Sequence, residues 1–107
     1  MDKHSSMTKK HRFLKVIQDN PGRMRSYGVK EIGVFGSVAR GEDKKGSDFD
    51  VLVVFEKGKK SFRNFAGLVD FLEMKLGAPV ELVTRESLSP YIGPRILKEV
   101  EYVPIAS

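Results

Sequence analysis

Three carboxylates beside short apolar runs are the residues of this sequence best suited to chemistry. Asp48 and Asp50 directly precede the apolar run 51–54, and Glu81 lies inside a second run at 80–83. Side chains two apart in a strand share a face, so the two aspartates point the same way from Cα atoms roughly 7 Å apart. A carboxylate entering a buried strand is costly unless its charge is compensated. Because Mg²⁺ typically takes one or two carboxylates with substrate phosphates and water, this spacing predicts a Mg²⁺ site at Asp48 and Asp50.

Glu81 is the candidate for a third carboxylate at the same site. Strand alternation points its side chain away from the face that Val80 and Leu82 occupy. There it can complete a second metal site or accept the proton of an attacking hydroxyl, two roles that serve in-line displacement at phosphorus. An edge-strand glutamate that reaches water explains the residue equally well. We predict Asp48, Asp50 and Glu81 as catalytic and metal-binding residues, and both interpretations of Glu81 stay open.

A candidate anion site precedes the aspartates. Gly36 follows an apolar run and lets backbone amides approach a phosphate, and Ser37 opens a short helix whose first N–H groups and hydroxyl favour anions. Arg40 lies one turn later and adds positive charge. An ordinary turn also explains a Gly-Ser pair, and Lys44 and Lys45 also fit as ordinary loop residues. The conjunction with the aspartates favours phosphate binding at Gly36, Ser37 and Arg40.

Apolar spacing and turn residues predict the elements that position these side chains. We expect helices over 8–18, 62–76 and 94–100, a short helical piece between 20 and 28, and strands over 29–35, 49–55 and 80–83. The run 49–55 is continuously apolar apart from Asp50, which is typical of a central strand covered on both faces. The order of elements predicts an α/β (α+β) fold with a small mixed β-sheet flanked by helices.

Length and composition limit the alternatives. The chain has 107 residues, so we expect one domain over 1–107, with a polar, flexible amino end at 1–7; whether Met1 or Met7 is the native start stays open. Cysteine is absent, which excludes disulfides, thiolate zinc sites and cysteine nucleophiles and is compatible with the cytoplasm. An apolar run long enough for a signal peptide or a membrane span is also absent, so we expect neither secretion nor membrane insertion.

The net charge of +5 would attract polyanions. The lysines at 9, 10, 44, 45, 57, 59 and 60 nevertheless lie in three separate polar segments without interleaved aromatic residues, which favours a solvated surface. We therefore do not expect direct nucleic-acid binding. His4 and His11 lack metal-ligand spacing and receive no role.

The two segments that contain the predicted anion site and the two aspartates resemble a known sequence motif. Gly36-Ser37-Val38-Ala39-Arg40-Gly41, followed by Ser47-Asp48-Phe49-Asp50-Val51-Leu52-Val53, is similar to the motif of the DNA polymerase beta-like nucleotidyltransferase superfamily. With its short length and the segments 80–84 and 91–99, the chain resembles the minimal nucleotidyltransferases, or MNT (MntA-like) antitoxins, over about 27–103. The resemblance implies a nucleotidyltransferase fold, phosphate contacts at Gly36 and Ser37, and Mg²⁺ at Asp48 and Asp50. Its third carboxylate is Glu81, where family members commonly have aspartate.

The resemblance also implies a partner and an activity. Family members of this size are often encoded with a HEPN-class, RNA-cleaving toxin and act as its antitoxin, in some cases by transferring AMP from ATP to it. The leading interpretation is thus an active, metal-dependent nucleotidyltransferase that uses ATP and Mg²⁺. The alternative is a catalytically weak or inactive module of the same fold that neutralises a partner by contact. The acceptor, the nucleobase preference, the number of metals and the oligomeric state stay open.

Overall fold

The computed structural model of the protein describes residues 7–106. His4 and nearly all of the amino end expected to be flexible therefore lie outside the described residues. The elements in chain order are α1 (Lys9–Asp19), α2 (Pro21–Ser26), β1 (Val29–Phe35), α3 (Gly36–Arg40), β2 (Phe49–Phe55), α4 (Phe62–Leu76), β3 (Val80–Thr84), the 3₁₀ turn η2 (Arg85–Ser87), α5 (Gly93–Glu99) and β4 (Glu101–Tyr102). Each predicted helix and strand is present, and the bounds differ from the predictions by no more than about two residues.

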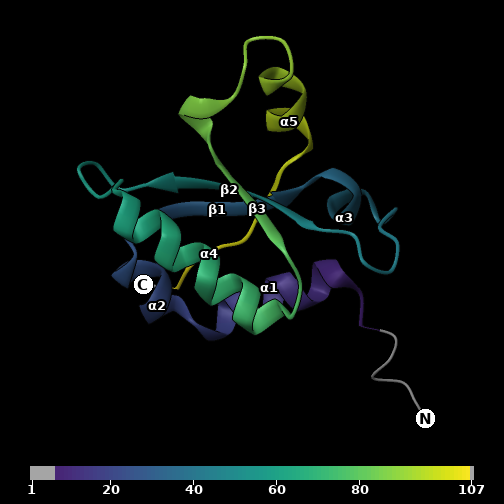
Figure 1. The fold of residues 1–107 in the computed structure, drawn as a ribbon, viewed down its shortest axis with the longest axis horizontal. Helices are drawn as coiled ribbons and strands as arrows, with labels where there is room; N and C mark the ends of the chain where they lie inside the picture. Colours follow the sequence, from purple (N-terminus) through teal and green to yellow (C-terminus); the bar gives the residue numbers. More distant parts are fainter. Residues whose placement is uncertain (1–6, 107) are drawn as a thin grey trace.

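The four strands form one mixed sheet in the order β3-β2-β1-β4 (Figure 1). β1 pairs antiparallel with both β2 and β4, whereas β2 pairs parallel with β3 through the crossover helix α4. The mixed sheet is as predicted. β4 was not predicted, because two residues are too short to give a periodic signal; its register pairs Gly33 with Tyr102 and Val34 with Glu101.

Helices α1, α2 and α4 cover one face of the sheet, and α5 rises on the other side (Figure 1). Capping residues fix the amino ends of the two long helices. The Thr8 hydroxyl accepts a hydrogen bond from the His11 N–H at 3.0 Å, and the Ser61 hydroxyl accepts one from the Asn64 N–H at 3.1 Å. Gly77 ends α4 with a left-handed φ of 67°. None of the helices within 7–106 has both the length and the hydropathy to cross a bilayer.

The core lies between the sheet and this helix layer. It is built from apolar side chains that alternate along the strands and recur at helical spacing in the helices: Phe13, Ile17, Val34, Phe49, Val51, Val53, Leu68, Phe71, Leu72, Leu76, Val80 and Leu82. β2 is covered on both faces, as expected, only along its middle. On the face turned away from the helix layer Leu52 is fully buried, whereas Asp50 and Val54 are only half-buried.

Candidate active site

The predicted carboxylates of β2 and β3 lie on the face of the sheet opposite helices α1, α2 and α4. Phe49 and Val51 are buried in the core, so Asp50 between them points to the opposite face. In the parallel pairing of β2 with β3, Asp50 is the register partner of Glu81. Register partners in adjacent strands point to the same face, and Glu81 is exposed there beside Asp50. The alternation predicted for Glu81 is therefore found in the structure.

Negative charge concentrates around Asp50. Burial raises the pKa of the Asp50 carboxyl above its ordinary value, and the charges of three neighbouring carboxylates raise it further, against one opposing guanidinium. Those carboxylates belong to Glu81, Asp48 and Glu99, and the guanidinium belongs to Arg40. The ionised site is thus short of positive charge, which a bound cation would supply.

The carboxylates do not form a preformed metal cage. Among residues 7–106, no group of three or more histidine, aspartate or glutamate side chains converges closely enough to hold a metal ion alone. Asp48 and Glu81 are both exposed, and like charges without a cation between them repel. The donor set instead fits Mg²⁺, which takes one or two carboxylates and completes its shell with substrate phosphates and water.

Gly36 brings the anion site and the carboxylates together. In the pairing of β1 with β2, the preceding Phe35 is opposite Asp50. Gly36 has a φ of 73°, and a Cβ built on it would overlap the Asp50 Oδ2 and lie 3.1 Å from the Asp50 Cγ. Only glycine combines that backbone conformation with so close a carboxylate. The predicted phosphate-binding turn and the predicted metal ligand are therefore in contact across the end of the sheet.

Two further residues of the predicted anion site lie in α3. Ser37 follows Gly36 in the first turn, is half-buried, and its carbonyl accepts a hydrogen bond from the Glu42 N–H at 2.8 Å. Arg40 ends the helix, and its guanidinium donates to Glu42 Oε1 at 2.9 Å and to Glu99 Oε1 at 2.7 Å. Arg40 is thus beside the site, as predicted, with its charge already engaged by two glutamates.

Glu99 is a site residue that sequence reasoning missed. Its Oε2 accepts a hydrogen bond from the Gly36 N–H at 2.5 Å. Burial alone would raise the pKa of Glu99, but the Gly36 N–H and the Arg40 guanidinium outweigh it and hold that pKa below its ordinary value. Glu99 ends α5, so a carboxylate from the carboxyl end of the chain lies against the start of α3. A pocket of about 190 Å³ separates α3 from α5 beside this contact.

Lys9 is a second residue that the sequence did not single out. Its ammonium donates to the carbonyl of Ser47 at 2.8 Å and to that of Lys44 at 3.3 Å. The Ser47 hydroxyl in turn accepts a hydrogen bond from the Lys44 N–H at 2.8 Å. These bonds fix the loop that ends at Asp48 to the first turn of α1. Lys44 and Lys45 themselves are exposed, in keeping with ordinary loop residues.

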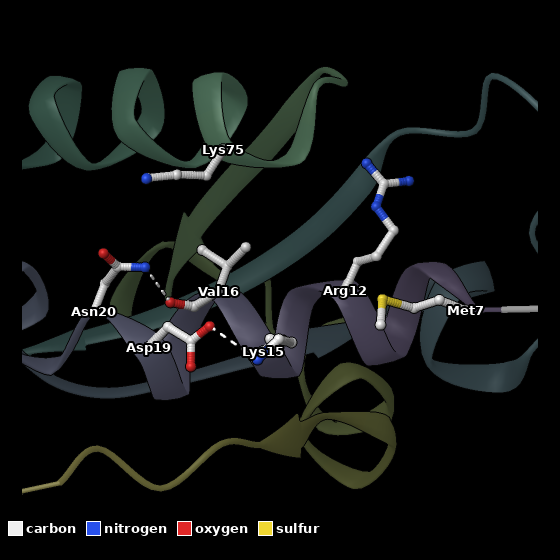
Figure 2. Close-up of a pocket in the computed structure, with 7 residues that line it drawn as sticks. All are labelled: Met7, Arg12, Lys15, Val16, Asp19, Asn20 and Lys75. Carbon is white, nitrogen blue, oxygen red and sulfur yellow. Dashed lines mark hydrogen bonds and ion pairs between the residues drawn. The ribbon is translucent and has the colours of Figure 1, made fainter. Parts of the chain in front are cut away.

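A larger pocket lies elsewhere on the molecule. Figure 2 shows a pocket of about 310 Å³ between α1 and the carboxyl end of α4, on the helix side of the sheet. Its charged groups are partly paired with one another: Lys15 lies 3.1 Å from the Asp19 carboxylate, and Arg12 donates to the Leu76 carbonyl. It contains none of the predicted site residues, so this pocket is separate from the candidate active site at Gly36 and Asp50.

Comparison with known proteins decides the family of this site. The sequence pattern of the nucleotidyltransferase domain family matches residues 12–103, which include every predicted site residue. The chain belongs to the nucleotidyltransferase domain family. It is an MntA-like nucleotidyltransferase by its sequence relatives: it is 49% identical over 77 residues to the protein adenylyltransferase MntA of Thermococcus cleftensis, covering 72% of this chain and 77% of that protein.

Solved structures of nucleotidyltransferases share the fold. A minimal nucleotidyltransferase matches with a TM-score of 0.73 and 34% identity, covering 91% of this chain and 97% of that one. The complex of a tri-AMPylated Shewanella oneidensis HEPN toxin with its MNT antitoxin matches with a TM-score of 0.62, covering 92% of this chain and 74% of that one. Its identity of 18% shows likeness of fold alone.

The contacts of Lys9 give a first prediction for this nucleotidyltransferase. Lys9→Met removes the ammonium that ties the 44–47 loop, so Asp48 loses part of its fixed position. We expect kcat/KM for nucleotidyl transfer to fall about tenfold, since small misplacement of a catalytic group costs on this scale. Steady-state assays with labelled ATP measure the change.

The matched control for this prediction is Lys10→Met. Lys10 is the next lysine of α1 and pairs with the exposed Glu101 at 3.1 Å, away from the loop. We expect kcat/KM of that variant to stay within about twofold of the wild-type value, because exposed ion pairs contribute little. Equal losses in both variants would show that Lys9 acts only through surface charge.

Proposed function

We propose that this nucleotidyltransferase is a single-domain, metal-dependent protein adenylyltransferase of the cytoplasm. In this proposal it transfers AMP from ATP to a HEPN-type toxin and thereby acts as its antitoxin. The observation that carries the proposal is the contact of Asp50 with Gly36, which brings a metal ligand to a phosphate-binding turn. The relative named protein adenylyltransferase MntA supports the reaction, and the AMPylated HEPN toxin seen with an MNT antitoxin supports the acceptor class.

Each site residue has a stated role in this reaction. The Gly36 N–H, Ser37 and Arg40 would hold triphosphate oxygens, and Asp48 and Asp50 would hold Mg²⁺, which would neutralise charge on the phosphates. A hydroxyl oxygen of the acceptor attacks the α-phosphorus, the bond from that phosphorus to the β-phosphate bridging oxygen breaks, and pyrophosphate leaves. The hydroxyl proton passes to a carboxylate, and Glu81, which is exposed beside Asp50, is the candidate acceptor.

A non-catalytic binding module is the second candidate. Two observations favour it: the third carboxylate is a glutamate, and the described residues contain no preformed three-carboxylate cage. In that case the protein would inhibit its partner by contact alone, and the carboxylates would not be needed. The two candidates differ in what they require of Asp48, Glu81 and Mg²⁺.

The deciding experiment combines the protein with a purified HEPN-type toxin, ATP labelled at the α-phosphate, and Mg²⁺ or EDTA. We expect label on the toxin with Mg²⁺ and none with EDTA, Asp48→Ala or Asp50→Ala. Glu81→Gln tests whether Glu81 takes part in the reaction. A loss of about a hundredfold or more in the rate of transfer fits a proton acceptor or a metal ligand, rather than an edge-strand glutamate that only reaches water. Toxin inhibition that survives both aspartate substitutions, without label transfer, would support the binding module instead.

A further inference from the structure

An anionic side chain of the protein itself already occupies the proposed phosphate site. The Glu99 carboxylate uses both oxygens there: Oε2 accepts from the Gly36 N–H at 2.5 Å, and Oε1 accepts from Arg40 Nη1 at 2.7 Å. The Glu99 side chain is 20% exposed and that of Arg40 45%, so the bond with Gly36 is partly buried and the bond with Arg40 is open to solvent. These are the donors that the proposed function assigns to triphosphate oxygens.

A carboxylate and a phosphate compete for such donors. A backbone N–H has one hydrogen, and a charge-assisted bond from it to Glu99 excludes an equally good bond to a phosphate oxygen. The carboxylate also adds a negative charge near Asp50, where the charge of a triphosphate would lie. A nucleotide that binds at Gly36 must therefore displace Glu99, and Arg40 is then released to meet phosphate oxygens.

The position of α5 allows such a displacement. Of the seven residues of this helix, all of them described, only Gly93 is buried. Figure 1 shows α5 on the side of the sheet away from the helix layer, joined to β3 by a long connection. The pocket of about 190 Å³ between α3 and α5 adds space beside the contact, and Arg95 on α5 offers an alternative positive partner for Glu99.

We propose that Glu99 is a built-in competitor of the triphosphate, which closes the nucleotide site until ATP displaces it together with the end of α5. The inference rests on the proposed nucleotide site at Gly36. The apparent dissociation constant of a ligand is its intrinsic value divided by the fraction of protein in the open form. If Glu99 leaves the site open about one-tenth of the time, removal of Glu99 tightens nucleotide binding about tenfold.

Calorimetric titration with Mg²⁺ and α,β-methylene-ATP tests the affinity without turnover, because this analogue cannot release pyrophosphate. We expect a dissociation constant about tenfold lower for Glu99→Gln, which removes the charge, and at least as low for Glu99→Ala, which removes both acceptor oxygens. The matched control is Glu101→Gln, the same charge change two residues away at an exposed position. We expect its dissociation constant to stay within about twofold of the wild-type value.

A fluorescence measurement reports the movement of α5 separately. The sequence contains no tryptophan, and Tyr91, which precedes α5, is 93% exposed. In a Tyr91→Trp background we expect the analogue to change the emission. Adding Glu99→Gln is expected to produce part of that change before any nucleotide is present.

The outcomes separate the two proposals. Equal or weaker analogue binding by Glu99→Gln and Glu99→Ala, with a wild-type protein that binds, overturns the competitor role and leaves the proposed function intact. Weaker binding in particular would make Glu99 a contributor to the site. Absence of binding by all of the proteins overturns the nucleotide site itself. A comparable gain in Glu101→Gln would assign the effect to net charge and also overturn the inference.

Discussion

Asp50→Asn is expected to lower AMP transfer at least about a thousandfold and, at the same time, to raise the melting temperature of the metal-free protein. The loss follows from removal of the charge of the proposed metal ligand, because metal stabilisation of transition-state charge contributes several kcal/mol and about 4 kcal/mol corresponds to a thousandfold. The gain in stability follows from the electrostatics of the apoprotein. There Asp50 is half-buried among Glu81, Asp48 and Glu99.

The sign of the stability effect follows from proton linkage. The pKa of Asp50 is higher in the folded protein than in the unfolded chain. Burial is the larger cause, and the neighbouring carboxylates are the smaller one. The folded protein therefore binds this proton more tightly than the unfolded chain, and stability falls as pH rises through the folded-state pKa. Asparagine carries no charge, so the advantage of Asp50→Asn should be largest at neutral pH and should shrink as the pH falls towards the unfolded-state pKa.

Thermal unfolding in EDTA at several pH values measures the melting temperatures of the wild-type protein and Asp50→Asn, and a second series contains Mg²⁺ and α,β-methylene-ATP. In the second series the wild-type protein should have the higher melting temperature, because only a protein that binds these ligands is stabilised by mass action. The control is Asp70→Asn on the exposed side of α4, which should change neither activity nor the melting temperature appreciably. Transfer within tenfold of wild type in Asp50→Asn would contradict the assigned role.

The main carboxylates could be placed from sequence because their relation to one another is local or follows from sheet pairing. Asp48 and Asp50 are two apart, so strand alternation predicts one side for both, and Asp48 lies directly before the first residue of β2. Glu81 needed one further step, the parallel pairing that puts it beside Asp50. Gly36 needed the antiparallel pairing of β1 with β2, which a short polar loop between two strands favours.

Glu99 could not be placed in this way. It is 63 residues from Gly36, and no periodicity connects a helix end to the start of another helix across a sheet. The exposure at the ends of one face of β2 was also missed, because a continuous apolar run does not tell how much of each face is packed. Leu52 is fully buried in the middle of that face, whereas Asp50 and Val54 near its two ends are half-buried, and the site lies at the Asp50 end.

Gly36→Ala is expected to abolish measurable nucleotide binding and to reduce transfer by about a hundredfold or more. Its Cβ would overlap the Asp50 Oδ2, so either the carboxylate must leave its position or the first turn of α3 must shift away from the sheet. Both responses separate the phosphate donors from the metal ligand. The left-handed φ of 73° adds a strain of roughly 1–2 kcal/mol for any residue with a Cβ.

Gly41→Ala separates the effect of backbone strain from that of the Cβ overlap with Asp50. Gly41, which directly follows α3, has the same φ of 73°, and a Cβ built on it meets nothing within 4 Å. The two variants should therefore lose similar stability from backbone strain, while only Gly36→Ala loses nucleotide binding, measured by calorimetry with α,β-methylene-ATP. If Gly41→Ala lost binding to the same extent, strain in α3 would account for both effects. The contact between Gly36 and Asp50 would then no longer explain how the phosphate site is joined to the metal site.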